Sequence, residues 1–189
     1  LAWPMELTVL AAPLAAVAVA VLFGWFCIRL SGVYLAMLTL AFAQILWSVA
    51  FQSAWTGGDN GILGVWPAAW LGSKTAYYYF TLALVMLSLL FTRRVIFAPF
   101  GYALRAGRDS PLRADAIGID VRRQQWAAFA LAGAFAGLAG ALHAFHKGSV
   151  FPNVLSIPHS VDALVMVLLG GVQTLSGPIV GAAVYHALL

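Results

Sequence analysis

The sequence predicts an all-α protein, a polytopic bundle of transmembrane helices with about six spans in this stretch of chain. Hydrophobic residues make up 63% of the 189 residues and charged residues only 8%, against about 25% charged in ordinary soluble domains. Several apolar runs reach the roughly 20 residues that a helix needs to cross a bilayer. Most basic residues lie in one block between two of those runs, so the bilayer is the solvent that suits this chain.

The apolar runs define the predicted spans in order. The first four cover residues 7–28, 32–55, 77–92 and 124–146. A fifth apolar region follows Asp162 and continues to the end of the chain. Gly170-Gly171 and Ser176-Gly177-Pro178 interrupt it, and a Gly-Pro pair would break one long helix. We therefore expect a helix, a tight turn and the beginning of a sixth helix.

The distribution of arginine predicts the orientation of the spans. Seven of the ten basic residues lie between the third and fourth spans: Arg93, Arg94, Arg105, Arg108, Arg113, Arg122 and Arg123. Short loops rich in Lys and Arg stay on the cytoplasmic side. We therefore expect this loop and Arg29 inside, and the segments 56–76 and 148–160 outside. This clustering also favours membrane topology over nucleic-acid binding as the reason for the net charge of +4.

Small residues recur on single faces of two predicted spans. Ala12, Ala16, Ala20 and Gly24 follow each other every four residues in the first span. In the fourth, Gly133 and Gly137 form one pair, and Ala132, Ala136, Gly140 and Ala144 form another stripe. Small side chains let helix backbones approach closely in lipid, so we interpret these faces as helix-packing surfaces.

Residues 98–120 contain the start and stop signals of two short helices. Pro99 suits the opening of a helix that Gly107 would close. Ser110-Pro111 is a good cap and first-turn pair, and Gly118 suits the C-terminal cap of the second helix. Leu112 and Ile117 are apolar residues among polar neighbours in this second helix. The pattern predicts either a docking surface for a soluble partner or a pair of interfacial helices lying on the headgroups, and by itself it favours neither.

Uncharged polar residues mark a candidate solute path in and beside the second span. Gln44, Ser48 and Gln52 recur every four residues and therefore share one helix face. Intramembrane polar groups face a cavity or another helix, and hydrogen bonding between helices is the simpler account for any one of them. The loop that follows contains glycines whose exposed amides suit an anion such as a carboxylate. Its residues are Thr56, Gly57, Gly58, Asp59, Asn60 and Gly61.

Several function classes find no support in the sequence. It contains no G-x-x-x-x-G-K-[ST] loop and no Ser/His/Asp or H-E-x-x-H pattern, so we expect neither catalytic residues nor an ATP site. His143 and His146 stand three apart without a third ligand nearby, and the lone Cys27 lies in an apolar run, so we expect no metal site or disulfide. A secondary transporter or channel remains the alternative, and it predicts a charged residue at mid-span.

The order of these segments resembles the permease subunits of branched-chain amino acid ABC importers. The resemblance is carried by Phe100–Ala106 with Ala114–Ile119, by Val33–Ile45 with Thr56–Ile62, by Phe129–Leu142, and by Leu168–Pro178 with Gly181-Ala182. Each piece alone is a loose pattern, and their order and spacing are specific. Since the chain opens on Leu1-Ala2-Trp3 and stops inside an apolar segment, we expect residues 1–189 to be one transmembrane domain of a longer subunit.

The resemblance implies partners and roles. The family's cytoplasmic loop inserts into a groove of the ATPase, which here implies a coupling loop over residues 98–120. Other implied partners are a second permease subunit, identical or related, and a periplasmic binding protein, with the chain multi-pass in the bacterial inner membrane. ATP and magnesium are expected on the ATPase, with no cofactor on this chain. The implied coupling residues are Gly101, Arg105, Ala106, Pro111, Ala114, Gly118 and Ile119.

Overall fold

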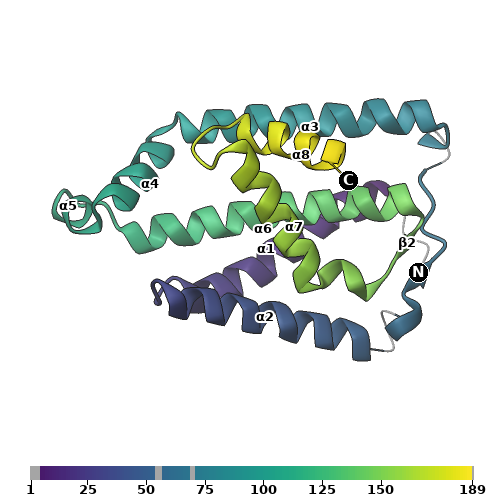
Figure 1. Ribbon diagram of the computed structural model, residues 1–189, viewed down its shortest axis with the longest axis horizontal. Helices are drawn as coiled ribbons and strands as arrows, with labels where there is room; N and C mark the ends of the chain where they lie inside the picture. The colour runs from purple at the N-terminus through teal and green to yellow at the C-terminus, as the bar shows by residue number, and fades with distance from the viewer. Residues whose placement is uncertain (1–4, 54–56, 69–70, 189) are drawn as a thin grey trace. The chain divides into compact units, whose positions relative to one another are not determined.

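The computed structural model describes residues 5–53, 57–68 and 71–188 (Figure 1). The contacts within the chain divide it into two compact units. The first unit comprises residues 1–39 and 63–150, and the second comprises residues 40–62 and 151–189. Eight α-helices dominate the described residues, which confirms the all-α prediction. They are α1 (Met5–Cys27), α2 (Val33–Gln52), α3 (Lys74–Ile96), α4 (Pro99–Asp109), α5 (Pro111–Ala116), α6 (Val121–Lys147), α7 (Ile157–Gly170) and α8 (Gly177–Leu188).

The minor elements lie next to the ends of the long helices. Where the chain is described, two short 3₁₀ helices cover Gly58–Asn60 and Pro152–Leu155, and two short strands, β1 (Ile62–Leu63) and β2 (Ser149–Val150), pair as a minimal sheet. Within the first unit this pairing continues as the Val65 N–H donates to the Gly148 carbonyl at 3.1 Å. The prediction of one transmembrane domain over residues 1–189 stays a prediction.

Four of the described helices, α1, α2, α3 and α6, are long and apolar enough to cross a membrane. They correspond to the first four predicted spans, and α2 is continuous. The fifth apolar region forms two separate apolar helices, α7 and α8, of 14 and 12 residues. Both are shorter than the roughly 17 residues at the low end of the range for a spanning helix. By length, the described residues thus hold four candidate spans rather than six.

The small-residue faces of α1 and α6 pack against each other within the first unit. A Cβ added to Gly133 would lie 2.5 Å from the Ala20 Cβ, and one added to Gly137 would lie 2.6 Å from the Ala16 Cβ. Only glycine fits at these two contacts, which confirms the predicted packing role of that pair. The second stripe on α6 behaves differently, because a Cβ on Gly140 would meet nothing within 4 Å.

Helix α3 is fixed to the rest of the first unit at its N-terminal end. The Tyr77 hydroxyl donates to the Leu142 carbonyl of α6 at 2.6 Å. Nearby, Met5, Val9, Leu71 and Phe145 form a buried apolar cluster. Ser73 begins α3 by accepting the Ala76 N–H at 3.1 Å. The helix therefore begins three residues before the predicted span, because a capping side chain extends it.

In the second unit, α7 and α8 form a hairpin that depends on glycine. A Cβ on Gly181 would overlap the Met166 carbonyl, and one on Gly170 would overlap the Gly177 carbonyl. The predicted fifth apolar region follows Asp162, but α7 begins earlier, at Ile157, and Asp162 lies in its second turn. Its carboxylate accepts the Tyr185 hydroxyl of α8 at 2.9 Å. A proline near the helix start extends α7 towards its N-terminus, and Asp162 links the two helices instead.

Candidate functional site

The first candidate site is the helical hairpin of α4 and α5, which connects α3 to α6 beyond their ends (Figure 1). Pro99 occupies the first turn of α4 and Pro111 the first turn of α5, where the missing N–H has no cost. The predicted stop at Gly107 is wrong, since α4 continues to Asp109. Gly107 instead allows close packing, because a Cβ there would lie 3.0 Å from the Val121 Cγ1 at the start of α6.

Helix α5 ends at Ala116, and Gly118 forms the turn that closes it, as the sequence predicts. This glycine has a φ of 86°, in the left-handed region. The Gly118 N–H donates to the Asp115 carbonyl at 3.0 Å, and the Ile119 N–H donates to the Ala114 carbonyl at 3.0 Å. This pair of bonds is the Schellman motif. It turns the chain sharply, and Asp120 then caps α6 by accepting the Arg123 N–H at 3.1 Å.

The predicted coupling residues divide into internal supports and exposed positions. Gly101 and Ala114 are buried. A Cβ on Gly101 would overlap the Ile96 carbonyl, so this glycine sets how closely α4 folds back on α3. The Ala106 carbonyl accepts the Ser110 N–H at 3.0 Å, and Ile119 is partly buried. Arg105, Pro111 and Gly118 are exposed.

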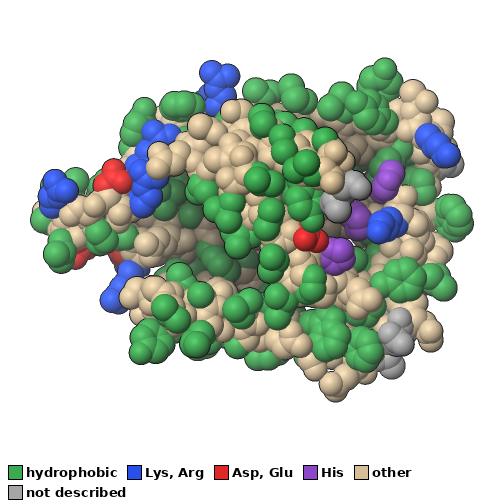
Figure 2. Space-filling view, in the orientation of Figure 1, with side chains coloured by type: hydrophobic (Ala, Val, Ile, Leu, Met, Phe, Trp, Pro, Cys, Tyr) green, Lys and Arg blue, Asp and Glu red, His purple; other side chains and the backbone are tan. Residues whose placement is uncertain are grey.

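Arg105 is held by aromatic rings rather than by a carboxylate. Its guanidinium carbon lies 5.7 Å from the centre of the Tyr102 ring and 5.9 Å from that of Phe97. Arg108 pairs with its neighbour Asp109 at 3.1 Å. Lys and Arg side chains gather on this end of the molecule, whereas hydrophobic side chains cover much of the surface in view (Figure 2).

Two apolar residues of the hairpin were not among the predicted coupling positions. Leu112 is 86% exposed and Ile117 is 73% exposed, whereas Ala114 between them is 2% exposed. Large apolar side chains at this exposure offer contact area to another molecule. The sequence did carry a signal, since both residues stand among polar neighbours in a short capped helix. The coupling positions implied by the family resemblance include instead the residues that set the shape of the hairpin.

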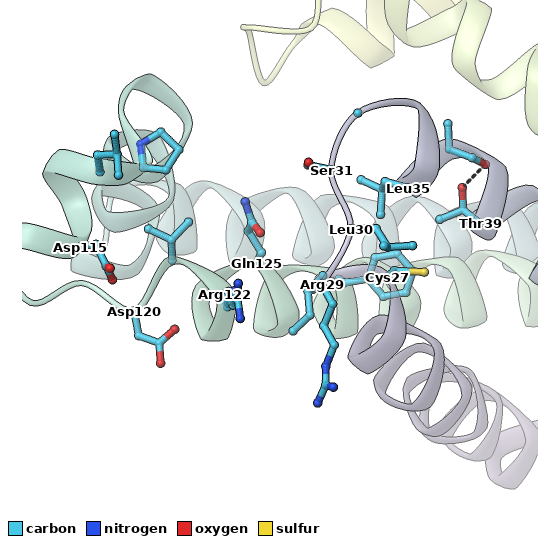
Figure 3. Close-up of a pocket in the computed structure, with 17 residues that line it drawn as sticks. Cys27, Arg29, Leu30, Ser31, Leu35, Thr39, Asp115, Asp120, Arg122 and Gln125 are labelled. Atoms are coloured by element: carbon cyan, nitrogen blue, oxygen red, sulfur yellow. Dashed lines mark hydrogen bonds between the residues drawn. The ribbon is translucent and has the colours of Figure 1, made fainter.

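A pocket of about 1100 Å³ adjoins α5 within the first unit. The last residue of α1, the loop after it and the first turns of α2 line one side of the pocket, and α5 and the start of α6 line the other. Figure 3 shows Asp115 from α5 beside Asp120, with Arg122 and Gln125 on α6 and Arg29 and Ser31 in the loop after α1. The lining mixes both signs of charge with apolar groups such as Leu112, a composition that suits a protruding side chain of a partner protein.

The second candidate site is the polar face of α2. Gln44 and Gln52 are exposed and Ser48 is partly exposed, so none of the three is used to fill a core. The Gln52 Nε2 donates to the Ser48 Oγ at 3.0 Å along the helix. The structure therefore keeps these groups on one accessible strip. Among the described residues, no hydrogen bond joins the predicted path residues of α2 to another helix.

Trp47 belongs to the same strip and was missed by sequence reasoning. It stands three residues after Gln44 and one before Ser48, and its ring stacks on Phe51 with centroids 5.1 Å apart. Its indole nitrogen is buried and has no hydrogen-bond acceptor among the described residues. A buried donor without a partner is costly, and the described residues offer this N–H no acceptor. An indole in an apolar span gives no such signal in sequence.

The loop after α2 has the predicted glycine conformations. Gly57, Gly58 and Gly61 have φ values of 76°, 56° and 64°. The amides of Gly58 and Gly61 donate to the Ser53 and Gly58 carbonyls, each at 3.2 Å, so these two amides do not serve an anion. Asn60 is exposed. Thr56 and the side chain of Asp59 lie outside the described residues.

Comparison with known proteins gives consistent matches. The family model for the permease component of branched-chain amino acid transport systems matches residues 1–188. The high-affinity branched-chain amino acid transport system permease protein LivM of Escherichia coli (strain K12) is 32% identical over 85% of this chain and 44% of that protein. LivM of Salmonella typhimurium is 30% identical over the same shares.

A more distant relative is archaeal. The probable branched-chain amino acid transport permease protein LivH of Methanocaldococcus jannaschii is 38% identical over 43% of this chain and 25% of that protein. No solved structure matches this chain. The chain spans less than half the length of the LivM proteins it matches.

Proposed function

This chain belongs to the family of branched-chain amino acid transport permease components, and we propose that it forms part of the translocation pathway of an ATP-driven importer. The proposed cargo is a branched-chain or related small amino acid carried into the cytoplasm. The proposed location is the bacterial inner membrane. Four apolar helices of spanning length support a multi-pass arrangement, and the positive-inside rule puts the α4–α5 hairpin in the cytoplasm.

The observation that carries the proposal is the construction of the α4–α5 hairpin. Buried Gly101 and Ala114 and the turn at Gly118 give it a defined shape, and Leu112 and Ile117 project from it. A rigid element with exposed apolar side chains suits a groove in a soluble partner. We assign that partner as the ATPase subunit, which holds ATP and magnesium. The second permease subunit and the periplasmic binding protein complete the proposed assembly.

Reconstitution tests the energy source. The full-length subunit, assembled with its permease partner and ATPases in vesicles with the binding protein outside, should accumulate leucine only when ATP is supplied to the ATPases. An ATPase whose catalytic glutamate is replaced by glutamine is the matched control and should abolish uptake. Uptake that persists without ATPases and follows an ion gradient would instead establish the alternative, a secondary transporter.

The polar strip of α2 gives a second prediction. Replacing Gln44 by leucine (Gln44→Leu) removes an exposed amide from the proposed path, whereas Gln44→Asn keeps the amide at a shorter reach. We expect Gln44→Leu to lower leucine uptake about tenfold, since a lost hydrogen bond to a charged group contributes about 1.5–3 kcal/mol. ATPase activity should remain. If both variants and the unchanged protein take up leucine equally in the same vesicles, Gln44 is not part of the proposed path.

A further inference from the structure

An open pocket of about 650 Å³ lies where the C-terminal end of α1 meets the N-terminal end of α6, both in the first unit. Its lining combines aromatic and charged side chains from these two ends. They are Trp25 and Arg29 on one side and Asp120, Arg122, Arg123 and Trp126 on the other. Arg29, Asp120 and Arg122 also line the larger pocket beside α5, but the transport function proposed above gives none of these groups a role in translocation.

The aromatic wall of this pocket is fixed in place. The Trp126 indole N–H donates to the Val21 carbonyl of α1 at 2.9 Å. Trp25 meets Trp126 edge to face, with ring centroids 5.8 Å apart. The guanidinium carbon of Arg29 lies 4.7 Å from the centre of the Trp25 ring. Arg29 is therefore positioned over the wall by a cation–π contact.

The positive charge of the pocket exceeds what its own carboxylate neutralises. Asp120 is occupied, because it caps α6 and its Oδ2 lies 2.9 Å from the Arg123 Nε. Among the residues that the structure describes, no carboxylate lies within 4.0 Å of Arg29 or Arg122. Figure 3, which draws the neighbouring larger pocket, shows Arg29 in the loop after α1 and Arg122 in the first turn of α6; both also line the smaller pocket. Two guanidinium groups without a carboxylate suit a phosphate, which they bind through paired N–H donors.

The position of the pocket relative to the expected membrane surface favours a lipid as the source of that phosphate. It lies at the ends of two helices of spanning length, and tryptophan prefers the headgroup level of a bilayer. Along α1 the surface continues away from the arginines as exposed apolar side chains, with Leu22 57% and Phe26 52% exposed. A phosphate held at Arg29 would leave its acyl chains beside these residues.

We propose that this pocket binds the phosphate of an anionic phospholipid, with Arg29 and Arg122 as the ligands and the Trp25–Trp126 pair as the wall. Basic pockets between spanning helices on the cytoplasmic side are suited to such headgroups. A bound lipid would join the end of α1 to the start of α6, next to the turn at Gly118 that leads from the hairpin. The inference is independent of which solute the protein carries.

Native mass spectrometry of the full-length subunit in its complex tests the site. The complex is titrated in detergent with phosphatidylglycerol, phosphatidylcholine or inorganic phosphate. We expect retained phosphatidylglycerol adducts, with affinity falling about fivefold for each of Arg29→Gln and Arg122→Gln. Arg108→Gln is the matched control, since Arg108 is paired with Asp109 away from the pocket, and it should leave those adducts unchanged. The double variant Arg29→Lys/Arg122→Lys keeps both charges, so its affinity for phosphatidylglycerol should fall less than that of the double variant Arg29→Gln/Arg122→Gln.

The other outcomes overturn the proposal. The first is that the Arg29→Gln and Arg122→Gln variants retain as much phosphatidylglycerol as the Arg108→Gln control. The second is that phosphatidylcholine binds as well as phosphatidylglycerol. The third is that inorganic phosphate displaces the lipid at the same concentration. If the double variant Arg29→Gln/Arg122→Gln does not fold, brominated lipids give a second readout. Brominated phosphatidylglycerol should quench tryptophan fluorescence more than brominated phosphatidylcholine does, and Trp25→Phe should reduce that difference. Equal quenching by the two lipids would also overturn the site.

Discussion

Replacing Gly118 by valine is expected to abolish coupled transport while leaving the subunit in the membrane. The left-handed φ of 86° is strained for any residue with a Cβ, and most strained for a β-branched one. A strain of about 1–3 kcal/mol corresponds to a change of about fivefold to more than a hundredfold in the equilibrium between the native turn and other conformations. Leaving this conformation breaks the two bonds that close α5 and displaces Leu112 and Ile117. ATPase co-purification and ATP-dependent leucine uptake should both fall about tenfold or more.

The matched control at this position is Gly118→Asn, because asparagine tolerates the left-handed region. A Cβ at Gly118 meets nothing within 4 Å, so the two variants differ in backbone strain rather than in crowding. We expect Gly118→Asn to retain most uptake. Unchanged uptake by Gly118→Val would contradict the idea that the ATPase recognises the shape of this hairpin. Leu112→Ser tests the direct contact with the ATPase separately from the shape of the hairpin. This variant preserves the turn at Gly118, and it should still weaken ATPase binding.

Replacing Gly137 by valine is expected to disrupt the first unit itself. A Cβ there would lie 2.6 Å from the Ala16 Cβ and 2.7 Å from the Ala12 carbonyl oxygen. Two helix backbones leave no room for it, so α1 and α6 must separate. Overpacking of this kind costs about 1–3 kcal/mol, and sometimes more. Thermal denaturation of the purified subunit should show a clear loss of stability, and the yield of monodisperse protein should fall.

Gly140→Val isolates the packing contribution to this effect. It makes the same substitution in the same helix, so the change in helix propensity is shared, but nothing lies within 4 Å of the added Cβ. We expect it to remain close to the unchanged protein in stability. Similar losses for the two variants would mean that helix propensity, rather than contact between α1 and α6, explains the glycines.

The part of the fold that sequence reasoning predicted is local in origin. Helices α1, α2, α3 and α6 follow from apolar runs of spanning length, and the turn at Gly118 follows from the backbone freedom of glycine. These features depend on residues within a few positions of each other. For the same reason the glycine conformations after α2 were predictable. The anion-binding role of that loop stays a prediction, and the Gly58 and Gly61 amides would not contribute to it, because they donate to carbonyls.

The sequence by itself determined which segments are helices, where they turn and which faces carry small residues. The tertiary structure alone decided which of those faces meet, so that Gly137 is enclosed and Gly140 is open. It also paired Asp162 with Tyr185, placed Gly107 against Val121 and put Arg29 and Arg122 in the lining of one pocket. The physical reason is that each of these arrangements brings together residues from different segments of the chain. Periodicity fixes the direction of a side chain on its own helix, whereas its partner depends on how the helices pack.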